Sequence, residues 1–333
     1  MIRMFHIVSM LIAAALVLAS AGPIAAQDKN PSPGPNLPQE KKAVVLAAFG
    51  TTHSTGLKPF LEIKAKVEKA CPGTPVRLAF TANAVRQVWQ KRLADQAWLK
   101  ANPGVPQDVL NVKTPLAAIA ELQNEGRRLI AVQSLHIYAG EEYADLKSVL
   151  EGLASMRTLK PKLKPFQKLA LGRPALGEPG VRHPYQEDIA AAVKAVQLHL
   201  DLARQNGSAL VYMGHGNEHY STGVYVEFLE ALRAAHPDVP VFLGCVEGFP
   251  GLDAVTAGLK ESKARKAILL PFMLVAGDHA AADMCGDEAD SWKTALKKAG
   301  LEVNCRQTGL GELAGWQDLF VRHLLEAMQD EGF

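Results

Sequence analysis

The sequence predicts an α/β protein with two similar lobes, each built on a parallel sheet, and a cleft between them. Short runs rich in valine, isoleucine and leucine alternate with longer amphipathic stretches along the chain. Continuous apolar runs of this length suit parallel strands that are buried on both faces. The two halves of the chain also repeat the same order of motifs, which indicates an internal duplication. Alternation and repetition together predict the fold class.

The first 41 residues are set apart by their composition. Residues 1–27 combine a basic start, an apolar stretch and small residues near Ala26, which is the pattern of a cleavable signal peptide. Residues 28–41 are rich in proline and polar residues, and we expect a disordered leader there. The apolar stretch is too short for a stable membrane span. We therefore expect a periplasmic protein with no membrane span after signal cleavage.

The remaining chain exceeds one ordinary domain and is expected to form an N-terminal lobe at 42–180 and a C-terminal lobe at 181–333. Strands are expected at 43–50, 76–82, 129–137, 168–172, 209–216, 239–248, 266–277 and 301–307. Apolar residues recur with helical spacing, and helices are therefore expected, at 57–71, 83–100, 115–126, 226–236, 251–264, 291–300 and in a final stretch from Leu313.

Three pairs of segments match between the lobes in the same order: 47–62 with 213–230, 77–83 with 242–248, and 137–142 with 274–279. The first pair shares a strand, a glycine, a polar turn with Ser-Thr-Gly, and then Phe-Leu-Glu. This agreement predicts two Rossmann-like lobes related by a pseudo-twofold. Ligands of parallel α/β sheets bind beyond the carboxyl ends of the strands, so the loops at those ends are the candidate functional positions.

Composition argues against several functions. The formal charge of +2 is close to neutral, so nucleic acid is not an expected partner. Walker A, GxGxxG, HExxH and GxSxG patterns are missing at usable positions, so no nucleotide cofactor is expected. The four cysteines include no CxxC pair. Cys285 and Cys305 are a candidate disulfide in an oxidising compartment, and free thiols are the alternative.

Equivalent loops of the two lobes differ at reactive side chains. The differences pair Phe49 with His215, Thr81 or Ala82 with Glu247, and Glu142 with His279. His215, Glu247 and His279 thus follow three successive strands at equal intervals (247 − 215 = 32 and 279 − 247 = 32). Two imidazoles and one carboxylate suit Zn, Co, Fe(II) or Ni. The structural alternative for each is a histidine bonded to the backbone, or a glutamate in the first turn of a helix.

The N-terminal lobe contributes a carboxylate instead of a histidine. Glu142 occupies the loop position equivalent to His279, so it would face the metal-like cluster across the cleft and could take protons during a reaction. His136 lies within an expected strand, where a core histidine and a functional one are both open interpretations.

The segments QSLHIYAGEEY, MGHG and LPFMLVAGDHAAADMCGDEADSWK resemble those of the anaerobic sirohydrochlorin cobalt chelatases, which are class II chelatases related to ferrochelatase. The resemblance runs from about residue 41 to the end of the chain. It implies insertion of Co²⁺, with Fe²⁺ as a second metal substrate, into a tetrapyrrole without ATP. It also implies metal binding by His215, Glu247 and His279, and catalysis by His215, Glu142 and His279.

Two features depart from the family pattern. The family works in the cytoplasm, whereas this chain carries an export signal, so bound haem and a periplasmic metal or tetrapyrrole carrier are alternatives. Segment 90–112 is longer than the family pattern needs, and Trp89 and Trp98 could support a lid or a homo-oligomer contact. Arg86 and Lys91 are candidates for binding the carboxylates of the substrate.

Overall fold

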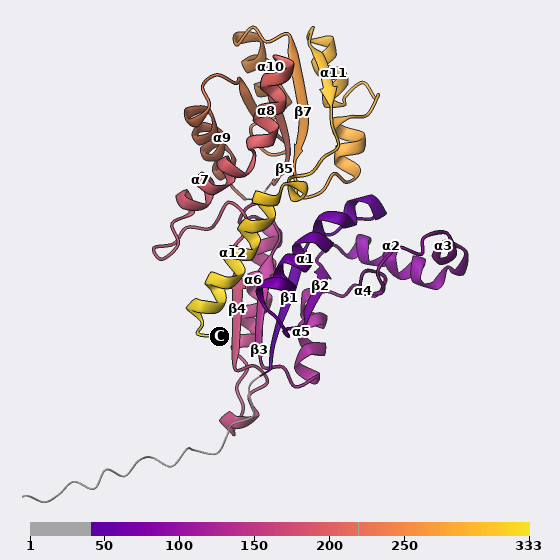
Figure 1. The fold of residues 1–333 in the computed structure, drawn as a ribbon, viewed down its shortest axis with the longest axis vertical. Coiled ribbons are helices and arrows are strands. Elements are labelled where there is room, and N and C mark those ends of the chain that lie inside the picture. Colours follow the sequence, from indigo (N-terminus) through magenta and orange to yellow (C-terminus); the bar gives the residue numbers. More distant parts are fainter. Residues whose placement is uncertain (1–40, 219) are drawn as a thin grey trace, which may run out of the picture. The chain divides into compact units, whose positions relative to one another are not determined.

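The computed structural model describes residues 41–218 and 220–333, which belong to one compact unit. The expected signal peptide at 1–27, and the expected leader apart from Lys41, lie outside the described residues. The described residues form two four-stranded sheets with helices packed against them (Figure 1).

The first sheet has the strand order β2-β1-β3-β4, and all neighbouring strands are parallel. Its strands are β1 (Lys42–Ala48), β2 (Val76–Phe80), β3 (Leu129–Ser134) and β4 (Lys168–Gly172). In β1, Val44 and Leu46 face one buried core and Val45 faces another. The apolar run is buried on both faces, as expected for a strand in a parallel sheet.

The second sheet repeats this order as β6-β5-β7-β8, again with parallel neighbours. Its strands are β5 (Ala209–Gly216), β6 (Val241–Glu247), β7 (Lys266–Phe272) and β8 (Glu302–Cys305). In both sheets the first strand along the chain is central, and the next one pairs on its outer side. The equal topology agrees with the predicted duplication, and the α/β fold with two parallel sheets is confirmed.

Helices connect the strands, as crossovers between parallel strands require. In the first half they are α1 (Lys58–Ala70), α2 (Asn83–Ala94), α3 (Gln96–Ala101), α4 (Gln107–Leu110), α5 (Pro115–Asn124) and α6 (Glu141–Ala154). In the second half they are α7 (Tyr185–Ala195), α8 (Gln197–Asn206), α9 (Gly223–Ala235), α10 (Leu252–Glu261), α11 (Trp292–Lys298) and α12 (Ala314–Asp330). Short turns lie at Ser54–Leu57, Pro161–Leu163, Ala280–Met284 and Leu310–Glu312.

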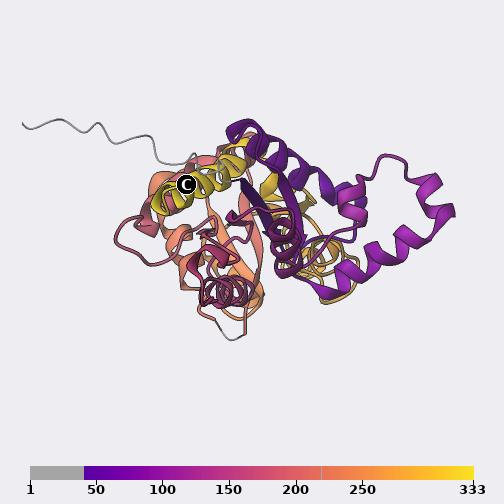
Figure 2. The same ribbon diagram turned by 90° about the horizontal axis from the view of Figure 1, so that it is seen from below.

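The last helix crosses from the second half of the chain to the first sheet. Helix α12 contacts β3, β4 and α1, and its residues Trp316, Phe320 and Leu324 are fully buried. Both views show this yellow helix beside α1 (Figures 1 and 2). The two sheets fall on either side of the expected boundary at 180/181, while α12 covers the sheet of the opposite half.

A buried ion network holds α12 in this place. Asp188 of α7 is fully buried and accepts hydrogen bonds from Arg173 (2.6 and 2.9 Å), Arg322 (2.7 Å) and His323 (2.9 Å). Arg173 also pairs with Glu326 at 2.7 Å. Burial alone would raise the pKa of Asp188, but the hydrogen bonds and charges of His323 and Arg173 lower this pKa to about 2.

Several expected strands end earlier than the apolar pattern indicated, and two of them end three or more residues early. The strand predicted at 266–277 ends at Phe272, where its pairing with β5 stops at Gly214. Beyond it, the carbonyls of Met273 and Leu274 accept hydrogen bonds from the backbone of Leu310 and Gly311 (2.8 and 2.9 Å). The strand predicted at 129–137 likewise ends at Ser134. Apolar residues continue past both ends because the chain stays buried or half-buried, although it has left the sheet.

Candidate metal and substrate site

The carboxyl ends of the second sheet bring the predicted residues together. His215 lies near the end of β5 and Glu247 ends β6; the register pairs the next residue, Gly216, with Glu247. The Nδ1 atom of His215 is 3.9 Å from Oε2 of Glu247. The rings of His215 and His279 meet nearly perpendicularly, with centroids 4.9 Å apart. His215 therefore lies beside both of the other predicted ligands.

The side chains of these predicted ligands do not converge on one metal-binding point. Among residues 41–218 and 220–333, no group of three or more histidine, cysteine or carboxylate side chains lies close enough to hold a metal ion. His215, Glu247 and His279 have 37%, 44% and 44% of their side chains exposed, so small rotations are open to each. The ligand set His215, Glu247 and His279 stays a prediction.

A pocket of about 430 Å³ lies where the strand ends of both sheets meet. Its walls include His215 and His279 from the second lobe and Glu142 from the first, whereas Glu247 is not part of the wall. Glu142 comes from the first turn of α6, where the helix dipole favours a carboxylate. The structure thus places Glu142 on the same pocket as the two histidines, as the lobe comparison predicted, although its proton-accepting role stays a prediction.

The first lobe supplies an apolar wall to this pocket. Phe49, the twin of His215, is 49% exposed and lines it. The following Gly50 has φ +102°, and a Cβ there would come within 2.6 Å of the Phe80 ring. Only glycine fits this close approach with a left-handed backbone. The turn therefore fixes where Phe49 meets the pocket.

Helix α2 donates hydrogen bonds to the loop after Phe49 and so fixes its position. Trp89 is fully buried and donates its indole N–H to the carbonyl of Thr51 (2.8 Å). Arg92 donates to the carbonyl of Thr52 and lies over the rings of Trp89 and Trp98, 4.5 and 5.0 Å from their centroids. Figure 1 shows α3, which carries Trp98, standing away from both sheets. Segment 90–112 thus supports the pocket loop, while a lid or subunit contact stays a prediction.

Two side chains in the first-lobe wall each have one polar atom without a hydrogen-bond partner among the described residues. Burial lowers the pKa of His136 to about 4, so its imidazole is neutral at ordinary pH. Its Nδ1 atom is 2.9 Å from the Ser134 hydroxyl, and its Nε2 is buried with no hydrogen-bond partner among the described residues. The Tyr138 hydroxyl is likewise buried and unbonded within the described part of the chain, and burial, then the charge of Glu142, raises its pKa.

Some contacts at the pocket were missed from the sequence. Asp283 lies 2.5 Å from Nδ1 of His279, four residues away in a wide turn. His53 and Asp278 form a 2.7 Å pair between the loops of the two lobes. The i,i+4 spacing of His279 and Asp283 could have indicated this contact. Residues four apart are neighbours only in a helical turn, and the sequence pattern did not predict such a turn there.

One candidate for binding substrate carboxylates is engaged elsewhere. Arg86 donates to the backbone carbonyls of Phe80 and Thr81, both at 2.6 Å, and burial lowers its pKa. It therefore fixes the end of β2. Neither Arg86 nor Lys91 is among the residues that line the pocket.

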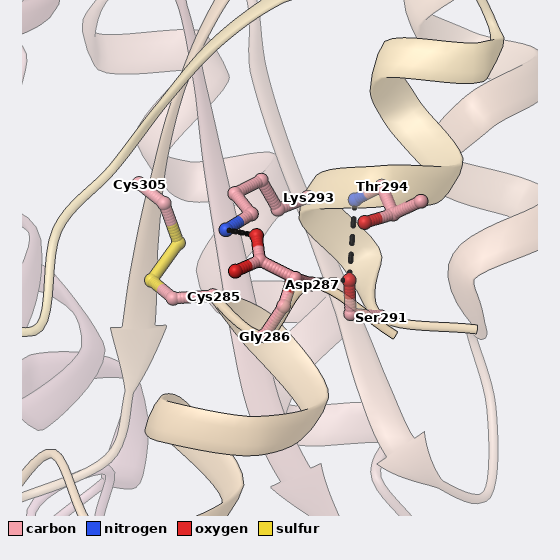
Figure 3. Close-up of a disulfide and its surroundings, with 7 residues drawn as sticks. All are labelled: Cys285, Gly286, Asp287, Ser291, Lys293, Thr294 and Cys305. Atoms are coloured by element: carbon pink, nitrogen blue, oxygen red, sulfur yellow. Dashed lines mark hydrogen bonds and ion pairs between the residues drawn. A yellow bond between two sulfur atoms is a disulfide. The ribbon is translucent and has the colours of Figure 1, made fainter. Parts of the chain in front are cut away.

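The candidate disulfide is present. Cys285 and Cys305 are bonded, with their Cα atoms 5.7 Å apart, and join the turn after His279 to β8 (Figure 3). Cys71 and Cys245 are buried free thiols.

Fold and pocket together define a two-lobed α/β protein with a pocket at the strand ends of both sheets. Two solved structures share the fold: SirB from Bacillus subtilis with Fe³⁺ (TM-score 0.53, 16% identity, covering 88% of this chain and 98% of that one), and the sirohydrochlorin chelatase SirB from Bacillus subtilis subspecies spizizenii in complex with cobalt (TM-score 0.51, 14% identity, covering 88% and 97%). At this identity the likeness shows the fold alone.

The chain belongs to the cobalt chelatase (CbiK) family, whose model matches residues 42–329. It is 30% identical over 289 residues to the sirohydrochlorin cobaltochelatase of Salmonella typhimurium, covering 86% of this chain and 97% of that protein. It is 31% identical over 296 residues to the sirohydrochlorin cobaltochelatase CbiKC of Nitratidesulfovibrio vulgaris, covering 89% and 94%. None of the helices in the described residues has the length and apolar character needed to cross a membrane.

Proposed function

We propose that this protein is a sirohydrochlorin cobaltochelatase that inserts Co²⁺ into the tetrapyrrole without ATP. Membership of the cobalt chelatase family supports the reaction. The observation that carries the residue assignment is the pocket in which Glu142 of one lobe and His215 and His279 of the other share a wall. Fe²⁺ is a second metal substrate of the same site, since an N/O ligand set accepts both ions.

The reaction requires three events that these residues can perform. Hydrated Co²⁺ must lose water, and two imidazoles with a carboxylate from His215, His279 and Glu247 can replace part of that shell. The ring must release two pyrrole N–H protons as the ion enters, so one Co²⁺ replaces two H⁺. Glu142 of the first lobe is one proton acceptor, and His215 of the second lobe can accept the other proton once the ion has passed into the ring and freed the imidazole lone pair.

The apolar wall suits the flat body of a tetrapyrrole. Phe49, Val88 and Leu274 line the pocket together with the polar groups, so a macrocycle could lie against carbon while its nitrogens meet the histidines. Binding then depends on burial of the ring.

The test is a chelation assay on the purified protein with sirohydrochlorin and Co²⁺, followed by absorbance. We expect turnover well above the spontaneous rate, with a loss of about 10²-fold or more in His215→Ala, His279→Ala and Glu142→Gln. His236→Ala is the matched control, because His236 contacts Arg204 at the surface of the second lobe, away from the pocket wall. Stoichiometric binding without turnover would replace the enzyme by a carrier, an alternative that no observation above favours.

Export is a separate part of the proposal. It rests on the signal-like pattern at 1–27 and on the Cys285–Cys305 disulfide, because disulfides persist in oxidising compartments. Cell fractionation and the intact mass of the purified protein test it: a periplasmic product with the mass expected after signal removal is the predicted result. A cytoplasmic, full-length product would overturn it. The same sample, by its absorbance and its elution volume, tests for bound haem and for a homo-oligomer.

A further inference from the structure

The side chain of His279 is held by its own turn. Residues Ala280–Met284 form a single wide turn in which Cys285 N–H donates to the carbonyl of Ala280, five residues back, at 3.2 Å. Within this turn, Oδ2 of Asp283 lies 2.5 Å from Nδ1 of His279. Both side chains are 44% exposed. Such a half-exposed pair adds little to stability, so stability does not account for the contact.

The turn is anchored at both ends, which keeps Asp283 in place. Ala280 and Met284 are fully buried in the core of the second lobe. Cys285 is bonded to Cys305 of β8, and the Ser291 hydroxyl donates to the carbonyl of Gly286 at 2.7 Å (Figure 3). The segment after Asp283 is thus tied to a strand and to the start of α11.

The contact has a chemical consequence for the imidazole. A carboxylate can only accept a hydrogen bond, so Asp283 selects the form of neutral His279 that carries its proton on Nδ1. The lone pair then lies on Nε2, which makes no hydrogen bond that the structure records within the described residues. His215 also turns Nδ1 toward the protein, 3.2 Å from the carbonyl of Gly216. Both rings therefore keep Nε2 for a ligand.

We propose that Asp283 is a positioning residue that orients His279 and fixes its tautomer for metal capture, on a turn anchored by the Cys285–Cys305 disulfide. This inference rests on the proposed role of His279 as a metal ligand. Carboxylate partners of this kind raise the basicity of a ligating imidazole, and their loss commonly weakens metal binding or activity by about 10- to 100-fold.

The experiment measures Co²⁺ binding to the purified protein by calorimetry and by the visible spectrum of bound Co²⁺, without tetrapyrrole. We expect Asp283→Asn and Asp283→Ala to weaken Co²⁺ binding by about 10-fold or more, with Asp283→Glu recovering part of the loss. In the chelation assay the KM for Co²⁺ should rise more than kcat falls. Asp287→Asn is the matched control, because Asp287 lies on the same segment, is 99% exposed and pairs with Lys293.

The outcomes separate this inference from the proposed function. If His279→Ala abolishes Co²⁺ binding while the Asp283 variants bind within threefold of the unmodified protein, His279 is a ligand and Asp283 does not position it. If His279→Ala leaves Co²⁺ binding unchanged, both the ligand role and the inference fail. If Asp287→Asn weakens binding as much as Asp283→Asn, the effect is one of general loop charge and the inference is overturned.

Discussion

Replacing Asp188 by asparagine tests how the last helix is held. Asp188 is fully buried and accepts hydrogen bonds from Arg173, Arg322 and His323. The fall of its pKa from 3.8 to about 2 corresponds to about 2 kcal/mol of stability at neutral pH. Asparagine also removes the carboxylate partner of Arg322 and one of the two carboxylate partners of the buried Arg173, which keeps Glu326. Removing one partner of a buried pair costs about 3–5 kcal/mol in total.

Urea denaturation followed by circular dichroism would measure this cost. We expect the midpoint to fall while the slope stays unchanged, because the folded shape is the same. Asp318→Asn is the matched control: Asp318 also lies on α12 and pairs with Lys66, but it is 66% exposed, so its loss should cost less than about 1 kcal/mol.

The stability of the protein at acidic pH gives a second test of the role of Asp188. A depressed pKa means that the stabilisation is complete above about pH 4 and is lost as the pH falls toward about 2. The gap between the unmodified protein and Asp188→Asn should therefore narrow in that range. A cost below about 1 kcal/mol at pH 7, or a gap that does not narrow in acid, would refute the reasoning.

Other predictions concern the second lobe. Burial lowers the pKa of His199 to about 4, so His199 should contribute a loss of about 3 kcal/mol of stability as the pH falls from 6.5 to 4, and His199→Gln should lose that much less. Urea denaturation at these two pH values measures the loss, and an equal loss in both proteins would contradict this. Removing the disulfide in a Cys285→Ser/Cys305→Ser variant should cost about 3 kcal/mol for its 20-residue separation, measured by calorimetry; an unchanged melting temperature would contradict this. Gly216→Ala would place a Cβ 1.8 Å from the carbonyl oxygen of Glu247, at a residue whose φ is +81°. We therefore expect the variant to be insoluble or to lose chelation activity, and a soluble variant with full activity would contradict this.

Much of the fold could be predicted from local patterns. Apolar runs such as 43–48 and 209–214 marked both central strands, and the repeated motifs indicated two sheets of equal topology. The strand predicted to reach Gly277 was wrong beyond Phe272, because a buried chain can stay apolar while its hydrogen bonds go to a turn at Leu310. Hydrophobicity reports burial more directly than it reports pairing.

The neighbouring positions of two candidate site residues could be predicted from the topology. His215 and His279 come together because parallel strands deliver their carboxyl ends to one edge. Contacts between distant segments, such as His53 with Asp278, left no trace in the sequence, since neither residue belongs to a periodic pattern. Arg86 was a candidate for binding substrate carboxylates because it follows a strand, and in the structure one of its guanidinium nitrogens donates to the backbone carbonyls of Phe80 and Thr81.

The crossing of α12 has a consequence for the order in which the molecule is completed. During synthesis, the strands of the first sheet leave the ribosome early, yet the helix that buries Trp316 and Phe320 against that half of the molecule is made only after the strands of both sheets. Domains usually fold as units, beginning with the N-terminal one. Here the first lobe cannot reach its final packing until the strands of the second sheet and then α12 have been made. The two lobes must therefore complete their folding together. A nascent chain halted before residue 314 would lack α12 and would expose the surface of the first lobe that α12 covers.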